Sequence, residues 1–110
     1  MKECYKLIQE LVTKETPFCK RCGAPATVGH HLYKRDRLAT AFLPEALWSL
    51  CTECHNWVHR NPYPFQVMVI NEIGERYYEL LRLSHTVVKN MDFDQVKKEL
   101  KKRLGEIPQP

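Results

Sequence analysis

The sequence has few glycines, no long apolar run and no strong excess of one charge. Its apolar runs, such as residues 67–70, are far shorter than the roughly 20 residues of a membrane-spanning helix, so we expect no membrane partner. Residues 1–6 carry both charges and lead into no apolar signal region, which favours a cytoplasmic protein. The net charge of +4 permits nucleic-acid binding but falls short of the basic character of a dedicated DNA-binding domain. At 110 residues, without repeats, the chain is expected to form a single domain, 1–110.

The cysteine pattern is typical of a metal site in a reducing compartment rather than of disulfides. Four of the five cysteines form two C-x-x-C pairs with the overall spacing C-x2-C-x28-C-x2-C, namely Cys19, Cys22, Cys51 and Cys54. Two such pairs supply the four thiolates of a tetrahedral structural Zn²⁺, whose binding energy becomes folding energy. The alternative is that the thiols are reduced and buried as small apolar groups. Cys4, the fifth cysteine, lies on the apolar face of an expected helix and is assigned to the core.

Four of the five histidines fall on the segments that such a zinc would bring together: His30, His31, His55 and His59. The spacing of His55 and His59 places both on one face of a helix. Three imidazoles can hold a divalent cation and leave coordination positions open for a scissile phosphate, while the fourth takes a proton from water. The alternative is that these residues brace a structural zinc site or lie on the surface. His85 is expected to have no role in the cluster.

The order of predicted elements indicates the α+β class. Apolar spacing predicts an amphipathic helix over residues 3–16 and a kinked helix over 64–83, interrupted near Gly74. Short strands are expected at 26–33 and 46–50, and a short helix at 52–61. Between the strands, residues 34–45 read as a basic loop. A last helix is expected to start at an Asp92 cap, with Gln95 at the capping-box position, and to stop at Gly105.

The motifs Cys19-x2-Cys22, Gly29-His30-His31-Leu32 and Leu50-Cys51-x2-Cys54-His55-x3-His59 together resemble the zinc-stapled HNH endonucleases. A looser similarity over residues 31–81 is to the phage NinG-type recombination nucleases. It depends on the basic loop, the second cysteine pair and an Asn-Pro-Tyr helix that ends in Ile-Gly-Glu-Arg. The HNH resemblance implies a small ββα-metal core with paired zinc knuckles at 17–61. An N-terminal helix (1–16) and a helical C-terminal extension (62–110) would flank this core.

The same resemblance implies a metal-dependent DNA endonuclease of phage or prophage recombination or processing. His31 matches the general base that activates water. Ligands of a catalytic Mg²⁺, Mn²⁺ or other divalent ion are matched by His30, His55 and His59. The family carries an asparagine that orients the base five residues before the third cysteine, where this chain has Ala46. Either another group, such as a backbone carbonyl, orients His31, or the fold is an inactive DNA-binding module.

Basic residues directly after the histidine pair, Lys34, Arg35 and Arg37, are predicted to contact DNA phosphates. The alternative for them is an ordinary solvated loop. The substrate can be branched or single-stranded DNA, and an enzyme that cuts branches would be expected to form a homodimer. A third hypothesis, a zinc-stabilised protein-interaction domain, would use the aromatic segment around Tyr77 and Tyr78.

Overall fold

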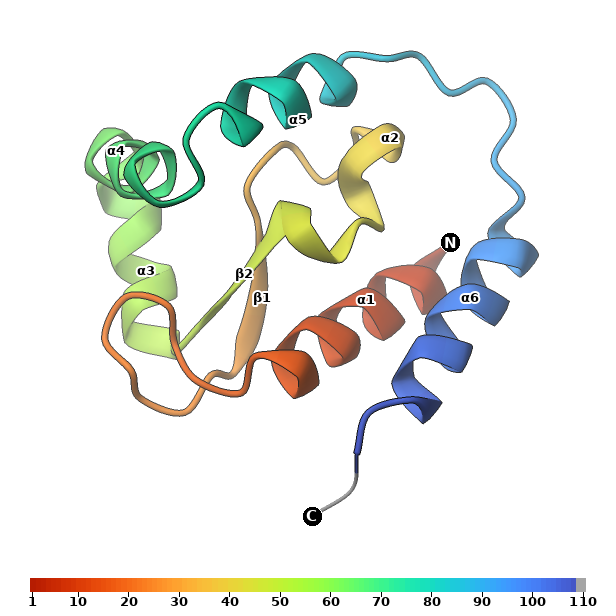
Figure 1. Ribbon diagram of the computed structural model, residues 1–110, viewed down its shortest axis with the longest axis horizontal. Coiled ribbons are helices and arrows are strands. Elements are labelled where there is room, and N and C mark those ends of the chain that lie inside the picture. The colour runs from red at the N-terminus through yellow and green to blue at the C-terminus, as the bar shows by residue number, and fades with distance from the viewer. Residues whose placement is uncertain (109–110) are drawn as a thin grey trace.

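The computed structural model describes residues 1–108 and shows an α+β fold, as predicted, in which helices surround a two-stranded antiparallel sheet (Figure 1). Its elements are α1 (Lys2–Glu15), β1 (Val28–His31), α2 (Leu38–Ala41), the 3₁₀ helix η1 (Pro44–Ala46), β2 (Leu47–Leu50), α3 (Thr52–Arg60), α4 (Pro62–Ile73), α5 (Arg76–Ser84) and α6 (Phe93–Gly105). Within this described part, no helix combines the length and the apolar character needed to cross a membrane.

The N-terminal helix α1 provides one side of the core. Its apolar stripe repeats every three or four residues, so that one face is buried: Cys4, Leu7, Ile8, Leu11 and Val12. This face packs against the sheet, and α6 returns from the far end of the chain to lie beside α1 (Figure 1). Cys4 is 2 % exposed, which confirms its assignment to the core.

Each strand of the sheet has four residues, and the register pairs His30 with Trp48 and His31 with Leu47. The edge of β1 that faces away from β2 is covered at one point by the Gln9 side chain from α1. Its amide nitrogen donates to the Gly29 carbonyl at 2.5 Å, and its amide oxygen accepts from the Gly29 N–H at 2.6 Å. A Cβ at Gly29 would meet the Gln9 oxygen at 3.3 Å, so glycine allows this close approach. The Gln9 amide thus makes, beside the histidine pair, the two hydrogen bonds that a neighbouring strand would otherwise make with Gly29.

Several expected elements differ in detail from the structure, and both strands are shorter than the expected 26–33 and 46–50. The basic loop over 34–45 contains α2 and the beginning of η1, because its Leu-Ala-Thr-Ala segment closes one helical turn. The interruption that the sequence predicted near Gly74 is confirmed: the segment forms two helices, α4 and α5, separated at Gly74, whose φ of 60° favours glycine. Asp92 caps α6 by accepting from the Gln95 N–H, as predicted. Gly105, the predicted stop, is the last residue of α6 and has no positive φ.

Candidate metal centres and a basic groove

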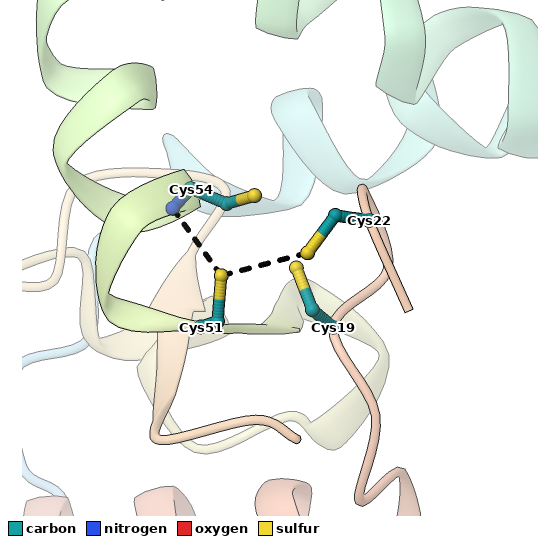
Figure 2. Close-up of side chains that lie close together, drawn as sticks. All are labelled: Cys19, Cys22, Cys51 and Cys54. Carbon is teal, nitrogen blue, oxygen red and sulfur yellow. Dashed lines mark hydrogen bonds between the residues drawn. The ribbon is translucent and has the colours of Figure 1, made fainter. Parts of the chain in front are cut away.

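The two cysteine pairs meet at one point (Figure 2). Cys19 and Cys22 come from the turn after α1, Cys51 precedes α3 and Cys54 lies in its first turn, and all four Sγ atoms are within 4.8 Å of one another. A tetrahedral zinc with Zn–S bonds of about 2.3 Å places its sulfurs about 3.8 Å apart. The Sγ atoms of Cys22 and Cys51 are 3.6 Å apart. The cluster therefore has the dimensions and donors of a Cys₄ zinc site.

Local backbone geometry orients each pair toward the centre. Gly23 has a φ of 81°, which turns the chain back so that its N–H donates to the Cys19 carbonyl at 2.9 Å. At the start of α3 the Cys54 N–H donates to the Cys51 sulfur at 3.4 Å, so this sulfur caps the helix. A thiolate at a helix N-terminus is stabilised by the unpaired N–H groups there. The glycine turn after Cys22 and the start of α3 thus hold the two cysteine pairs in place.

The electrostatics of the cluster favour a bound cation. Burial alone would raise the pKa of the Cys19 thiol. Hydrogen bonds from backbone groups of Cys51, Cys22 and Arg21 outweigh this effect and bring the pKa down to about 6. Burial raises the pKa of Cys54 to about 12, despite the Arg21 guanidinium 3.5 Å from its sulfur. Four sulfurs this close cannot all ionise without a compensating positive charge. A Zn²⁺ bound by the four sulfurs would supply that charge.

A second cluster is formed by His30, His55 and His59, whose ring nitrogens also lie within 4.8 Å of one another. The Nε2 atoms of His55 and His59 are 3.1 Å apart. Two ligand nitrogens on a tetrahedral zinc are about 3.3 Å apart when the Zn–N bonds are about 2.0–2.1 Å. Burial and the other histidines lower the pKa of His30 to about 4, and burial and His59 lower that of His55. Neutral imidazole, the form that binds metals, is therefore favoured.

The donors of this cluster distinguish between metals. No carboxylate belongs to it within residues 1–108. Magnesium prefers oxygen ligands in near-ideal octahedral geometry, whereas imidazole suits Zn²⁺ and other late transition metals. The expected Mg²⁺ therefore fits the three imidazoles poorly, and Zn²⁺ or a similar ion fits them better.

His31 follows His30 on β1, and side chains of successive strand residues point to opposite faces. Its Nε2 lies 3.0 Å from the carbonyl oxygen of Ala41, at the end of α2. Because a carbonyl only accepts hydrogen bonds, Nε2 carries the proton and Nδ1 keeps its lone pair. Burial lowers the pKa of His31, the Ala41 carbonyl raises it and Arg35 lowers it, with a net decrease that favours the neutral ring. A backbone carbonyl thus contacts the ring that the sequence left without an orienting asparagine.

Ala46, where the HNH resemblance places that asparagine, is a core residue. Its side chain is 2 % exposed and belongs to the core. Its carbonyl accepts from the Leu32 N–H at 2.9 Å, which continues the pairing of the two strands beyond His31. Because alanine has no polar side-chain atom, residue 46 cannot hydrogen-bond the His31 ring through its side chain.

A groove of about 760 Å³ joins the four histidines to the basic segment that directly follows β1, residues 34–37. Its walls include His30, His31, His55, His59, Lys34 and Arg35. Arg37 does not line it, because the Arg37 guanidinium is 2.9 Å from Nδ1 of His85 and faces a separate hollow beside α5. The structure therefore brings together two of the three predicted DNA-contacting residues with the histidines.

Sequence reasoning missed the side of the groove that α1 contributes. Tyr5, Lys6 and Gln9 line it beside the histidines. Their signal in the sequence is weak: Tyr5 and Gln9 lie one turn apart along one border of the apolar stripe, and Lys6 lies beyond them on the polar face. The sequence does not say which element that border faces. A backbone carbonyl was among the groups expected to orient His31, but the sequence did not say that Ala41 supplies it, because a backbone acceptor leaves no trace in residue type.

Comparison of the chain with protein-family models, with curated proteins and with solved structures finds no match. The geometry of the two clusters and of the groove is therefore the basis for assigning a function.

Proposed function

We propose that this chain is a metal-dependent endonuclease that hydrolyses phosphodiester bonds in DNA, with β1, β2 and α3 as a ββα-metal core of the HNH type. The observation that supports this proposal is one groove lined by a three-histidine cluster, by basic side chains that include Lys34 and Arg35, and by a separate neutral histidine, His31, whose Nδ1 makes no hydrogen bond within residues 1–108. Each of these groups matches one requirement of phosphodiester hydrolysis: charge stabilisation, a base and substrate binding.

The residues divide this work as follows. His30, His55 and His59 would hold the catalytic ion, and the four thiolates would hold a structural Zn²⁺. When bound in the histidine cluster, a divalent cation supplies positive charge for the phosphoryl oxygens. His31 accepts the proton of the attacking water at Nδ1, because Nε2 is already donating to Ala41.

The basic residues bind and orient the substrate. Lys34 and Arg35 neutralise phosphates as the DNA enters the groove. Their positive charge also disfavours protonation of the neighbouring base, and Arg35 lowers the pKa of His31 in this way. The same side chains thus bind the substrate and help to keep the base neutral.

A plasmid-nicking assay tests the proposal. The wild-type chain should nick supercoiled DNA with a divalent metal and lose the activity in EDTA. His31→Ala should lower the nicking rate by about 10²–10⁴-fold, the usual contribution of a general base, without loss of bound metal. His85→Ala is the matched control, since His85 is exposed and lies outside the groove, and it should nick like the wild type.

The choice of metal is tested in the same assay. The imidazole donors predict higher activity at equal low concentration with Zn²⁺, Ni²⁺ or Co²⁺ than with Mg²⁺ or Mn²⁺. If the chain binds DNA but nicks no duplex, single-stranded or branched substrate with any of these ions, the inactive DNA-binding module is the better description. If it binds no DNA even at low salt, both DNA-directed functions are excluded and a protein-interaction domain remains.

A further inference from the structure

We propose that the side of the groove formed by α1 contacts the substrate, and that Lys6 on this side binds a phosphate of the nucleic-acid backbone. This inference rests on the proposed function, because it assigns a substrate contact to the same groove. Lys6 is exposed and lines the groove together with the histidine cluster, Lys34 and Arg35. It lies far from these residues in the sequence and belongs to none of the cysteine or histidine motifs.

The charge of Lys6 is left without a partner by the ion pairs around it. On a helix, Lys6 has two carboxylates within reach, Glu3 one turn before it and Glu10 one turn after it. Glu10 instead pairs with Lys14 at 3.0 Å. Glu3 pairs with Lys97 of α6 at 2.9 Å and with Lys101 at 3.6 Å. No carboxylate in the described residues 1–108 pairs with Lys6, so its positive charge is available to a ligand in the groove.

Tyr5 fixes the distance between Lys6 and the basic segment. The Tyr5 hydroxyl donates to the Arg35 carbonyl at 2.6 Å, and the Arg35 guanidinium lies 4.7 Å above the Tyr5 ring. The helix and the segment after β1 are therefore joined directly. Gln9, one turn further along α1, anchors the same helix to Gly29 of β1. The backbone of α1 at Lys6 is thus held at a defined place relative to β1, and the exposed lysine side chain extends from it.

The lining of the groove favours a polyanion as its ligand. Lys6, Lys34 and Arg35 carry its formal charges, and no aspartate or glutamate lines it in the described chain. Asp36, the acidic residue of the basic segment, is outside the lining. Three separated cationic side chains around the histidine cluster suit a ligand with several regularly spaced negative charges, such as a phosphodiester chain. They suit a single small anion less well.

Salt-dependent binding tests this contact. Fluorescence anisotropy would measure binding of the zinc-loaded chain to labelled duplex and single-stranded DNA between 50 and 200 mM salt. The His31→Ala background prevents cleavage during the titration. Each phosphate contact contributes about 0.9 to the slope of log affinity against log salt for duplex DNA, and about 0.7 for a single strand. Lys6→Gln should lower the slope by these amounts.

The expected ratio of affinities follows from that slope. The binding defect of Lys6→Gln on duplex DNA should be about 3.5 times larger at 50 mM than at 200 mM salt, because the salt concentration changes fourfold. Lys6→Arg should restore the parental slope, since it keeps the charge. Lys102→Gln is the matched control: it removes an exposed lysine of α6 outside the groove and should leave the slope unchanged.

The outcomes separate the inference from the proposed function. If the parent chain binds neither DNA, the proposed function itself fails. If the parent binds and Lys6→Gln keeps the parental slope, the groove is used without α1 and the inference is wrong. Equal urea midpoints for all variants would show that the fold is intact, as expected for substitutions of exposed side chains.

Discussion

Replacing one exposed cysteine ligand should destabilise the whole chain. Cys22 is exposed, so Cys22→Ser removes little buried apolar area, and the substitution conserves shape. If the thiol is only a surface group, the cost in unfolding free energy should be within about 0.5 kcal/mol. If it binds a structural zinc, the cost is a large share of the metal's contribution.

The structure indicates how large that share is. Structural zinc contributes about 10–16 kcal/mol in zinc-finger peptides at neutral pH, and a small domain has about 5–15 kcal/mol of total stability. The turn that carries Cys19 and Cys22 is also held by backbone pairing, such as the Lys20 N–H donating to the Ser49 carbonyl at 2.9 Å and the isolated bridge of Phe18 with Pro25, so loss of one ligand should cost less than the whole contribution of the metal. We therefore expect Cys22→Ser to lower the unfolding free energy by at least about 3 kcal/mol.

Urea unfolding followed by circular dichroism, with and without EDTA, measures this effect. The wild-type midpoint should fall in EDTA, whereas that of Cys22→Ser should start low and change little. Cys4→Ser is the control. It places a hydroxyl at a core site that is 2 % exposed, where the Cys4 sulfur lies 3.4 Å from the Phe93 carbonyl, so it should cost about 1–2 kcal/mol and remain sensitive to EDTA.

Metal content gives an independent reading. The wild type should bind two zinc ions per chain, and His59→Ala should bind one. Cys22→Ser should bind fewer than one, because the histidine cluster depends on the helix that the cysteines anchor. A Cys22→Ser chain with the wild-type midpoint and two bound ions would refute the structural zinc site.

Three further predictions follow from single contacts. Ala46→Asn should lower the unfolding free energy by about 1–3 kcal/mol in urea unfolding, because it buries an amide in the core. It should not raise the nicking rate. Faster nicking would contradict orientation of His31 by a backbone carbonyl. Gln9→Glu should cost about 1–3 kcal/mol by the same measurement, since a carboxylate cannot donate to the Gly29 carbonyl; an unchanged midpoint would refute the role of the amide. The hydrogen bond from Arg76 lowers the pKa of Glu45, so this pair adds stability that is present above about pH 4.3 and is lost as the pH falls through the lowered pKa. Both side chains are nearly half-exposed, so solvent screens the pair and its contribution is small. When urea unfolding is repeated from pH 7 to pH 3, the wild type should lose slightly more unfolding free energy than Arg76→Gln; an equal loss would contradict the contribution of this pair.

Features that depend on local chain geometry were predictable from the sequence. The i, i+3/i+4 spacing of apolar residues gave the buried face of α1, and the spacing of His55 and His59 placed both on one face of α3. Two C-x-x-C pairs predicted convergence of four sulfurs because a tetrahedral metal needs all of them. Helical spacing determines which side chains share a face, and the four-ligand requirement of the metal determines that the two cysteine pairs meet.

Features that depend on packing between distant segments were not predictable. Arg35 and Arg37 are the same residue type two positions apart, yet one lines the groove and the other contacts His85 of the segment after α5. Lys6 looks like any lysine on the polar face of a helix until α1 is placed beside β1. The carbonyl of Ala41 near His31 depends on the helical turn of α2, which interrupts a segment that reads as a loop. Residue type carries no record of such neighbours.

The two candidate metal centres depend on each other in one direction only. Helix α3 has nine residues, fewer than an isolated helix needs to be stable in water. Its N-terminus is fixed by the Cys51 sulfur, and His55 follows Cys54 directly, so the position of this histidine depends on the cysteine cluster. The reverse does not hold, because His59 lies in the last turn of α3, away from the sulfurs. Loss of the structural zinc should therefore disorganise the histidine site, whereas His59→Ala should leave the cysteine site and the fold intact.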